Sequence, residues 1–513
     1  MINTDDGFVS LLMRRARDEP DRIFAHHKGE NLTCRALDDM STTLAHWLRG
    51  QGVEPGSRVL LMMRNSPLTI ALLFAIGKAG AVWVPVNVQS RGDNLRYIVE
   101  HAGPTVVVVD HDLVATLTED VPALDPARLR IVGGALGEQS LEAALIGSDP
   151  AAPFNRDLPD ADAPYAIMYT SGTTGRPKGV IVSHRMLRLS GEAIALVSAI
   201  EDGGVFHMWE PLFHIGGAQM IILPLIRRVH LAMVDRFSAS NFWHEIKDSG
   251  ATHIHFLGGL LQILLKQPPS PLDRTHGARI AFGGGCPRDI WREFEERFGV
   301  QIRECYGMTE CSSVTTYNGT GVLGSVGVEL PWFEVNLLDD AGQPVPRGER
   351  GEIVVRAKLP GAITKGYFNN PEATARAIKP DGFHTGDIGT QDANGNFFFH
   401  GRMTDNVRVK GENVSAFEVE HVAVQHLAVE DCAMIGVASD VGEQDIKLFV
   451  KAKTGETLAP AELSAWLGKR LAPYQNPRYI VVIDEFERTP SQRIMKHRLT
   501  ARTEQAWDRF KPS

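Results

Sequence analysis

The stretch VLLMMRNSPLTIALLFAIGKAGAVWVPV, residues 59–86, is the most apolar region of the chain and decides the class of fold. Arg64 and Lys78 interrupt it, so no run reaches the ~20 apolar residues that a membrane span requires. The run SRVLLMM at 57–63 is β-rich, and PLTIALLFAIGKAG at 67–80 has the length and composition of a helix. We therefore predict a buried helix between two strands.

The same alternation of strand and helix continues along the chain. TVVVVD at 105–110 and HLAMVD at 230–235 are short β-rich runs, and SASNFWHEIKDSG at 238–250 is a helical stretch that follows the second of them. Strands that are buried on both faces are apolar along their whole length, as these runs are. The pattern predicts an α/β fold built on largely parallel sheets.

The length of the chain predicts more than one domain. Its 513 residues exceed the roughly 250 to 300 at which a single hydrophobic core stops growing. From about Asn336 the strands become shorter and glycine-punctuated, as in GEIVVRA and GNFFFHGR, which indicates a small β-rich subdomain. We predict a large N-terminal domain, residues 1–403, of parallel-rich sheets packed with helices plus this subdomain, followed by a small α+β C-terminal domain, residues 404–513.

Composition narrows the class of protein. A hydrophobic content of 43% and a charged content of 22% are ordinary for a soluble globular protein. The formal net charge of -9 argues against an extended nucleic-acid surface, because such surfaces need clustered Lys and Arg. The cysteines form no CxxC pair, and the N-terminus begins with acids where a signal peptide would carry basic residues. We therefore expect a cytoplasmic protein with reduced thiols at Cys34, Cys286, Cys305, Cys311 and Cys432.

The stretch YTSGTTGRPKGV, residues 169–180, combines three glycines, a run of hydroxyl groups and one lysine. It is not a Walker phosphate loop, which would place a hydroxyl residue directly after the lysine. Glycines nevertheless let backbone amides approach phosphate oxygens, and Lys178 supplies a positive charge. The preceding APYAIMYT has the pattern of a buried strand, so the loop would leave a sheet edge. Taken alone, the stretch fits either a phosphate-binding loop or a flexible polar turn.

Five further motifs bear on that choice. They occur in the order PLFHIGG (211–217), FGGGCP (282–287), YGMTE (306–310), HTGD (384–387) and GRMTDNVRVKGENVSAFEVE (401–420). Together with the loop they resemble the acyl-adenylate-forming superfamily of AMP-binding enzymes, which includes acyl-CoA synthetases, amino-acid adenylation domains and luciferases. The resemblance covers nearly the whole chain, and six matches in one order make coincidence negligible.

The resemblance implies a two-step ligation. A carboxylate attacks the α-phosphate of ATP to give an acyl-adenylate and pyrophosphate, and a thiol then displaces AMP. Covalent activation splits one difficult acyl transfer into two easier ones. The implied substrates are a carboxylic acid, ATP and CoA, the implied cofactor is Mg²⁺, and the C-terminal domain is expected to be mobile between the two steps.

The resemblance also implies a nucleotide site. The loop up to Lys178 would hold the β and γ phosphates, Thr309 the α-phosphate, and Glu310 the Mg²⁺ ion, which is a hard cation that suits a carboxylate. Tyr306 would stack on adenine, and Asp387 would bind the ribose. The implied catalytic residues are Lys178, Thr309, Glu310 and Arg493, and the implied nucleotide-binding residues are Thr170, Ser171, Gly172, Thr173, Thr174, Gly175, Lys178, Gly283, Gly284, Gly285, Tyr306, Gly307, Thr309, Asp387 and Arg402.

Several of these residues also have a structural alternative. Tyr306 would then be a core aromatic, Glu310 a solvated surface acid, and Asp387 a turn residue after Gly386. Their place inside intact motifs favours the nucleotide site.

An acyl pocket is implied around PLFHIGG. Relatives use the histidine of this motif in gating the approach of carboxylate or thiol, although a lone histidine in an apolar segment also fits a structural role. Trp209 beside Glu210 could hold a quaternary ammonium group, because an aromatic ring and a carboxylate attract such a cation. The alternative is that Trp209 is a core residue and Glu210 an exposed strand-end acid. The implied substrate-binding residues are Trp209, His214, Gly216, Gly217 and Met308.

The tail departs from the family pattern at two places. The hinge of the mobile domain is usually Asp or Lys, and here it would be Thr404, which is β-branched and stiffer. The closing motif of relatives has glycine and then a lysine that contacts the substrate carboxylate and the α-phosphate. In RTPSQRIMKHRL, residues 488–499, Gln492 and Arg493 stand at these positions. Arginine keeps the charge and can bridge two anions, but a surface cation is the alternative, and Lys496 is not assumed to replace the lysine.

The acceptor of the acyl group is inferred indirectly. Gly411, with Lys410 before it, matches a segment that lines the thiol tunnel of relatives, where a glycine lets pantetheine pass close to the backbone. We expect no appended carrier domain, and the chain resembles crotonobetaine/carnitine-CoA ligases, so CoA is favoured. An acyl-CoA synthetase, a catalytically impaired nucleotide-binding relative and an enzyme that loads a carrier protein stay open as functions, and a homodimer stays open as the assembly.

Overall fold

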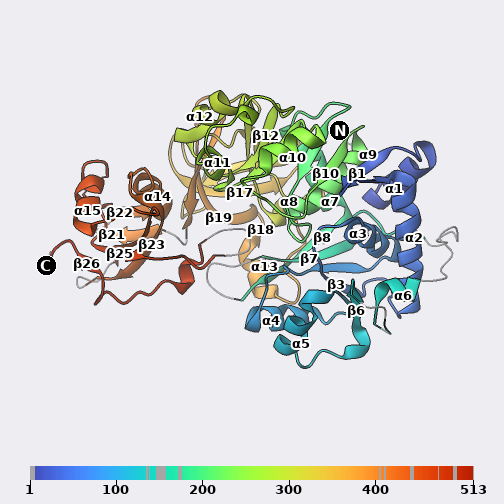
Figure 1. Cartoon of the computed structure of the whole chain (residues 1–513). Helices are drawn as coiled ribbons and strands as arrows, with labels where there is room; N and C mark the ends of the chain where they lie inside the picture. The colour runs from blue at the N-terminus through green and yellow to red at the C-terminus, as the bar shows by residue number, and fades with distance from the viewer. Residues whose placement is uncertain are drawn as a thin grey trace. The chain divides into compact units, whose positions relative to one another are not determined.

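A computed structural model describes residues 6–134, 137, 139–145, 157–170, 176–403, 406–409, 412–439, 444–471, 473–488 and 494–511. These residues form two compact units, and Figure 1 shows the elements of each. The first comprises the described parts of 6–170, 176–335 and 355–383, and the second those of 336–354 and 384–511. The predicted boundary between 403 and 404 stays a prediction. The predictions for residues 171–175, Thr404, Lys410, Gly411, Gln492 and Arg493 lie outside the described residues.

The large sheet of the first unit has the strand order β15-β14-β13-β12-β11-β9-β10-β1-β2. The strands from β13 to β1 pair in parallel, as their apolar runs predict, whereas β2, β14 and β15 pair antiparallel. The bounds are β1 Ile23–His27, β2 Glu30–Thr33, β9 Val205–Met208, β10 His230–Met233, β11 His253–Leu257, β12 Ile280–Gly284, β13 Gln301–Tyr306, β14 Thr316–Tyr317 and β15 Val328–Glu329.

A second sheet of the first unit has the order β6-β5-β3-β4-β7-β8 and is parallel except for the β7–β8 pair. The strand predicted before the glycine-rich stretch is confirmed as β7, and β8 follows that stretch in the chain. The bounds are β3 Arg58–Met62, β4 Val82–Pro85, β5 Val106–Asp110, β6 Leu129–Val132, β7 Pro164–Thr170 and β8 Lys178–Ser183.

Helix α3, Pro67–Ala79, confirms the predicted buried helix between two strands, because it joins β3 to β4 and is buried at every residue from Thr69 onward. Its ends follow from local chemistry. The hydroxyl of Ser66 accepts a hydrogen bond from the Thr69 amide, and Gly80 ends the helix in the left-handed region with φ of 68°. Within the described part of the chain, no helix combines the length and the apolar character needed to cross a membrane.

The remaining helices of the first unit cover its sheets. Helices α10, α11 and α12 bury Trp243, Leu261 and Trp291 in one core with β11, β12 and β13. Helix α4 buries Leu95 and Val99 against the second sheet. The bounds are α1 Phe8–Asp18, α2 Cys34–Gly50, α4 Gly92–Ala102, α5 Val114–Asp120, α6 Leu141–Leu145, α7 His184–Val197, α8 Ile215–Ala218, α9 Leu223–Ile226, α10 Phe242–Ser249, α11 Leu260–Leu265, α12 Arg288–Phe298 and α13 Pro371–Ala377.

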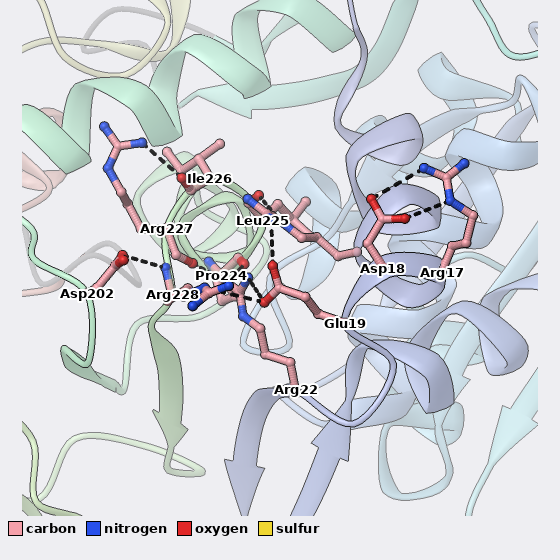
Figure 2. A network of polar contacts seen from close by, with 11 residues as sticks. Arg17, Asp18, Glu19, Arg22, Asp202, Pro224, Leu225, Ile226, Arg227 and Arg228 are labelled. Atoms are coloured by element: carbon pink, nitrogen blue, oxygen red, sulfur yellow. Dashed lines mark hydrogen bonds and ion pairs between the residues drawn. The ribbon is translucent and has the colours of Figure 1, made fainter.

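A polar network fixes the end of α1 against α9 (Figure 2). The Glu19 carboxylate forms ion pairs with two arginines: its Oε1 lies 2.9 Å from Nη1 of Arg15, and its Oε2 lies 3.1 Å from Nη1 of Arg22. Arg15 also donates to the carbonyl of Leu225 at 2.9 Å, and Arg22 donates to the carbonyl of Pro224. Burial disfavours the charged form of Glu19, but these arginines outweigh it and lower the pKa of the carboxyl group. The network therefore satisfies carbonyl groups that the short helix α9 leaves without intrahelical partners.

A third sheet has the order β16-β17-β19-β18, with β20 beside β19, and its residues are divided between the two units. The second unit also contains the hairpin β21-β22 and the sheet β23-β24-β25-β26, packed with α14 and α15 around one apolar core. The bounds are β16 Phe333–Leu338, β17 Gly351–Ala357, β18 Ile378–Lys379, β19 Gly382–Gln391, β20 Phe397–Arg402, β21 Asn406–Val409, β22 Glu412–Ser415, α14 Ala416–Ala423, β23 Val429–Ala438, β24 Gln444–Ala452, α15 Pro460–Gly468, β25 Tyr479–Ile483 and β26 Trp507–Asp508.

The five cysteines are free thiols, as the sequence predicts. Cys305 is half-buried, and the other four are buried: Cys34, Cys286, Cys311 and Cys432.

Candidate active site

The predicted site residues of the first unit lie where parallel strands of the large sheet end. Glu210 follows β9, Gly283 and Gly284 close β12, and Tyr306 is the last residue of β13. In an open parallel sheet the carboxyl ends of the strands meet at one edge, and ligands bind outside that edge. The topology therefore brings the motifs PLFHIGG, FGGGCP and YGMTE to the same side of the sheet.

The glycine loop at residues 283–285 has a backbone that only glycine adopts without strain. Gly283 has φ of 154° and Gly285 has φ of 93°. A Cβ on Gly283 would overlap the carbonyl oxygen of Phe256 on β11. The Gly258 amide donates to the carbonyl of Gly284 at 2.9 Å, so the loop is fastened to the chain that leaves β11.

Glu304, a residue that the sequence analysis did not single out, holds the other side of this loop. Its Oε1 accepts from the Gly285 amide at 2.6 Å, and its Oε2 accepts from the Cys286 amide at 2.9 Å. Burial raises the pKa of Glu304 to about 8, against the opposing effect of these two hydrogen bonds. The sequence signal that could have identified this residue is a glutamate within the buried strand β13, two positions before Tyr306.

The turn after β13 presents the YGMTE motif. The carbonyl of Tyr306 accepts from the Thr315 amide at 2.8 Å, and the carbonyl of Met308 accepts from the Ser313 amide at 3.0 Å. A Cβ on Gly307 would overlap the carbonyl oxygen of Ser313. Ser313 itself has φ of 71°, which is uncommon for a residue with a side chain. The turn is thus tightly constrained just before Thr309 and Glu310.

Glu310 lies in a buried cluster with Tyr367 and Lys178. The Tyr367 hydroxyl donates to Glu310 Oε1 at 2.9 Å, and the Lys178 ammonium lies 5.2 Å from the centre of the Tyr367 ring. The backbone carbonyl of Glu310 accepts from the Thr364 amide at 2.8 Å. The alternative of a solvated surface acid is wrong, because Glu310 is buried. Tyr367 is far from the motif in sequence, and no local pattern marked it.

This carboxylate suits Mg²⁺. Among the described residues, no group of three or more His, Cys, Asp or Glu side chains forms a metal cage. Mg²⁺ is usually bound by one or two carboxylates together with substrate phosphates and water, so a single buried acid beside Lys178 fits its chemistry.

The pocket motif rests on a second buried acid, Glu210. Its Oε2 lies 2.6 Å from Nδ1 of His255 on β11, and both side chains are buried. Burial favours the neutral form of Glu210 and would raise its pKa. The interactions of the carboxylate with His255 and His214 outweigh burial, so the pKa of Glu210 is lowered. The expectation of an exposed strand-end acid is therefore wrong.

The backbone around Glu210 is equally constrained. Asn65 donates to the carbonyl of Glu210 at 2.9 Å and accepts from the Leu212 amide at 2.8 Å. A Cβ on Gly216 would overlap the Glu210 carboxylate, and one on Gly217 would overlap the carbonyl of Pro211. The two glycines of PLFHIGG thus allow the start of α8 to lie directly on this acid.

Trp209 is partly buried and packs against the core formed by α10, α11 and α12. Its indole N–H donates to the carbonyl of His255 at 2.8 Å, and its ring lies 5.6 Å from that of Phe237. These contacts account for its position without a ligand. The core alternative for Trp209 is therefore supported, and its substrate-binding role stays a prediction.

In the second unit, the predicted ribose-binding residues are cross-strand neighbours. Asp387 on β19 pairs in register with Arg402 on β20, and Arg402 Nε lies 3.4 Å from Asp387 Oδ1. Asp387 is buried, and its amide donates to Thr385 Oγ1 at 3.0 Å. Glu352 supports the segment by accepting from the Gly386 amide at 3.0 Å. Asp387 thus lies within a strand, directly after the left-handed Gly386.

Lys496, the other cation of the closing motif, is held within the second unit. Its ammonium lies 2.9 Å from Glu420 Oε1 on α14. Lys496 thus has a carboxylate partner within its own unit, and a role in place of the family lysine is not assumed.

The comparisons with known proteins agree with these motifs. The family model of the AMP-binding enzyme matches residues 12–368, and that of the AMP-binding enzyme C-terminal domain matches residues 418–493. A crotonobetaine/carnitine–CoA ligase of Salmonella agona (strain SL483) is 30% identical over 491 residues, which is 90% of this chain and 92% of the relative.

Solved structures show the same fold. ATP-bound MatB from Rhodopseudomonas palustris has a TM-score of 0.85 at 27% identity, covering 97% of this chain and 98% of MatB. A benzoate CoA ligase from Burkholderia xenovorans LB400 has a TM-score of 0.84 at 26% identity, covering 96% and 99%. The chain belongs to the AMP-binding enzyme family.

Proposed function

We propose that the protein is an AMP-forming acyl-CoA synthetase. It activates a carboxylic acid with ATP to an acyl-adenylate, releases pyrophosphate, and then transfers the acyl group to CoA with release of AMP. The observation that carries this proposal is the cluster at the sheet edge, where the glycine loop at 283–285, Tyr306 and the Glu310–Tyr367–Lys178 group gather in one unit.

In this proposal each group has one task. Tyr306 stacks on adenine beside the glycine loop, Lys178 draws the terminal phosphates, and Thr309 donates to the α-phosphate. Glu310, oriented by the Tyr367 hydroxyl, holds Mg²⁺. When bound, Mg²⁺ neutralises negative charge on the phosphates.

The motifs assign further roles to residues of the second unit. Asp387 accepts from the ribose hydroxyls, and Arg402 supports it. Thr404 is the hinge of a mobile domain that comprises 404–513, Arg493 neutralises the α-phosphate during adenylation, and Lys410 with Gly411 lines the path of the CoA thiol. These last assignments rest on the motifs alone.

The acid is proposed to carry no fixed positive charge. The Glu210 carboxylate is buried and already has His255 as a partner at 2.6 Å, so it is not free to receive a quaternary ammonium group. An acid that carries a trimethylammonium group should therefore be used no better than an uncharged acid of equal length. A preference for the charged acid that disappears in Glu210→Gln would contradict this view.

A cytoplasmic location and a homodimer stay predictions for the whole protein. Free thiols support the former, and sedimentation of the purified chain tests the latter.

The function is tested with a panel of carboxylic acids. We expect pyrophosphate release that requires both the acid and ATP, and consumption of free CoA in the second step. Binding of ATP without pyrophosphate release for any acid would indicate an impaired relative. Pyrophosphate release without use of free CoA would indicate an enzyme that loads a carrier protein.

A further inference from the structure

We infer that His101 is a positioning residue that holds Lys178 in place for the phosphates of ATP. It acts through two aromatic residues, Tyr169 and Phe368, that contact the residue after the lysine. The inference rests on the proposed function, in which Lys178 draws the terminal phosphates. His101 lies in the last turn of α4, outside the motifs that the sequence analysis singled out.

His101 forms a hydrogen bond with Tyr169, a residue of β7. The Nδ1 atom of His101 lies 2.7 Å from the Tyr169 hydroxyl oxygen, and the two rings meet edge to face with their centres 5.8 Å apart. Burial lowers the pKa of His101 and raises the pKa of Tyr169, so both side chains are neutral near pH 7. The contact is therefore one partly buried hydrogen bond between uncharged groups.

The Tyr169 ring lies directly against the backbone next to Lys178. Tyr169 and Gly179 are opposite each other in the antiparallel pair β7–β8, and the next pair joins Thr170 to Lys178. A Cβ on Gly179 would stand only 3.3 Å from Cζ of Tyr169. The position of this ring therefore limits where the backbone beside Lys178 can lie.

Phe368 holds the same glycine from another direction. Its amide donates to the carbonyl of Gly179 at 2.7 Å, and its ring meets that of His101 edge to face at 5.5 Å. Phe368 follows Tyr367, whose ring centre lies 5.2 Å from the Lys178 ammonium. His101 thus contacts both aromatic residues that fix Gly179, and one of them adjoins the ring that faces the lysine.

Helix α4 also contacts the chain before the lysine. Tyr97 precedes His101 by four residues, on the same face of the helix, and the two rings are stacked with their centres 5.1 Å apart. The guanidinium carbon of Arg176 lies 5.2 Å from the centre of the Tyr97 ring. Since Arg176 precedes Lys178 by two positions, α4 fixes the backbone on both sides of the lysine.

A comparison of ATP with AMP separates this role from a general effect on the fold. AMP lacks the β and γ phosphates that Lys178 is proposed to contact, so its affinity reports the rest of the nucleotide site. A lysine ammonium is a compact point charge on a flexible stem, and its attraction to a phosphate falls when it is displaced. Loss of the hydrogen bond between His101 and Tyr169 should therefore weaken binding of ATP and spare binding of AMP.

The experiment measures binding of ATP with Mg²⁺, and of AMP, to the full chain by calorimetry without a carboxylic acid. Tyr169→Phe removes only the hydroxyl, and His101→Phe keeps an aromatic ring but removes Nδ1. In each variant the dissociation constant of ATP should rise about threefold to tenfold, the equivalent of one hydrogen bond, while that of AMP is unchanged. In pyrophosphate release, the KM for ATP should rise more than the kcat falls.

Two further variants test whether the effect passes through this hydrogen bond. The double variant His101→Phe/Tyr169→Phe should lose no more ATP affinity than either single variant, because each change alone already breaks the same bond. His101→Asn, whose amide group stands near the place of Nδ1, should restore part of the affinity.

Tyr165→Phe is the matched control. Tyr165 lies on the same strand, and its buried hydroxyl donates to the carbonyl of Leu73 at 3.0 Å. Its loss should lower the Tm but leave the ratio of ATP to AMP affinity unchanged. Equal weakening of ATP and AMP in the His101 and Tyr169 variants, an unchanged ratio, or additive losses in the double variant overturn the inference. A wild type that binds neither nucleotide contradicts the proposed function itself.

Discussion

Two buried carboxyl groups near the same sheet edge have pKa values that are shifted in opposite directions, because their neighbours differ. Glu210 faces His255 at 2.6 Å, and the imidazoles lower its pKa in spite of burial. Among the described residues, the partners of the Glu304 carboxyl group are the backbone amides of Gly285 and Cys286, and burial raises its pKa to about 8. The interactions with the imidazoles thus outweigh desolvation at Glu210, whereas the two backbone amides do not outweigh it at Glu304.

Glu304 should make the stability of the protein depend on pH. Its pKa is raised from 4.5 to about 8, so between these values the folded chain binds more protons than the unfolded chain. Stability then falls as the pH rises through this window. We expect the Tm of the wild type to drop by about 2–3 °C more than that of Glu304→Gln between pH 6 and pH 9, measured by calorimetry. Parallel Tm curves for the two proteins would show that this carboxyl group does not titrate on unfolding.

Glu310 and Tyr367 should affect turnover through the metal requirement. Glu310→Gln removes the charge that suits Mg²⁺ and should lower kcat by roughly 10² or more. Tyr367→Phe removes only the hydroxyl that orients Glu310, so it should cost about tenfold and raise the Mg²⁺ concentration for half-maximal rate. The two variants are distinguished by measuring the rate of pyrophosphate release as a function of Mg²⁺ concentration.

Asp387→Ala serves as the contrast, because it should weaken ATP binding with a smaller effect on turnover. If Glu310→Gln and Asp387→Ala both bind and turn over like the wild type, the assignment of the nucleotide site is wrong.

The candidate site was predictable from sequence only where its chemistry is local. Gly283, Tyr306 and Glu310 lie in short motifs whose spacing is visible in the chain. Glu304 and Tyr367 act through strand pairing and a long-range contact, and Tyr367 lies 57 residues from Glu310. Such partners are set by the tertiary fold, so a single sequence gives no pattern for them.

At the scale of elements, Lys78 joins two helices by burying a charge. It lies in the last turn of α3, and its ammonium donates to Asp38 Oδ1 and to Thr42 Oγ1 of α2, each at 2.7 Å. It also donates to the Asp38 carbonyl at 2.9 Å. Burial lowers the pKa of Lys78, and Asp38 opposes this. All three donors of the ammonium are thus satisfied.

Removing the partner should cost more than removing the lysine. Asp38→Ala leaves an unpaired buried ammonium, which typically costs 3–5 kcal/mol, or roughly 3–5 °C in Tm for a chain of this size. Lys78→Met replaces the charge with an apolar side chain of similar length and should cost less. Asp39→Ala, at the neighbouring position, is the control and should lower the Tm by no more than about 2 °C. Thermal unfolding by circular dichroism compares them, and equal losses in Asp38→Ala and Asp39→Ala would contradict this account.

The helices could be predicted from the pattern of apolar residues, whereas their exact ends depend on the residues that cap them. The prediction of a helix over 67–80 matches α3, which ends where Gly80 adopts a left-handed conformation. The prediction over 238–250 was too long at its start, because α10 begins at Phe242. The preceding Ser-Ala-Ser-Asn segment has little apolar surface to bury, so packing does not extend the helix over it.

At the scale of the whole molecule, Arg493 is the residue that tests how the tail takes part in the reaction. If it neutralises the charge that develops at the α-phosphate, Arg493→Ala should lower adenylation by roughly 10² or more. Thioester formation from pre-made acyl-adenylate should be largely spared. Each half-reaction is measured separately, the first by pyrophosphate release and the second by consumption of CoA.

Lys496→Ala is the control for this prediction. Because Lys496 is paired with Glu420, its loss should lower stability but leave the adenylation half-reaction within about threefold. Normal adenylation in Arg493→Ala together with a large loss in Lys496→Ala would reverse the two assignments.

The overall organisation was predictable because alternating apolar runs and ordered motifs extend over most of the chain. The division into compact units was less so. The described residues 336–354 group with 384–511, whereas 355–383 group with the first unit, so chain order and spatial grouping differ. The change of strand texture near Asn336 marks the first crossing point, whereas no such change was recognised in the sequence at 354–355 or 383–384.

The buried cysteines make the protein a convenient object for chemical labelling. Burial raises the pKa of all five thiols, at Cys34, Cys286, Cys305, Cys311 and Cys432, so they stay protonated and react slowly with maleimides. The native chain should take up little dye until it is denatured. One new surface cysteine in each unit would then carry a fluorophore pair in an otherwise unaltered protein, and energy transfer between the dyes would report whether the units move during turnover.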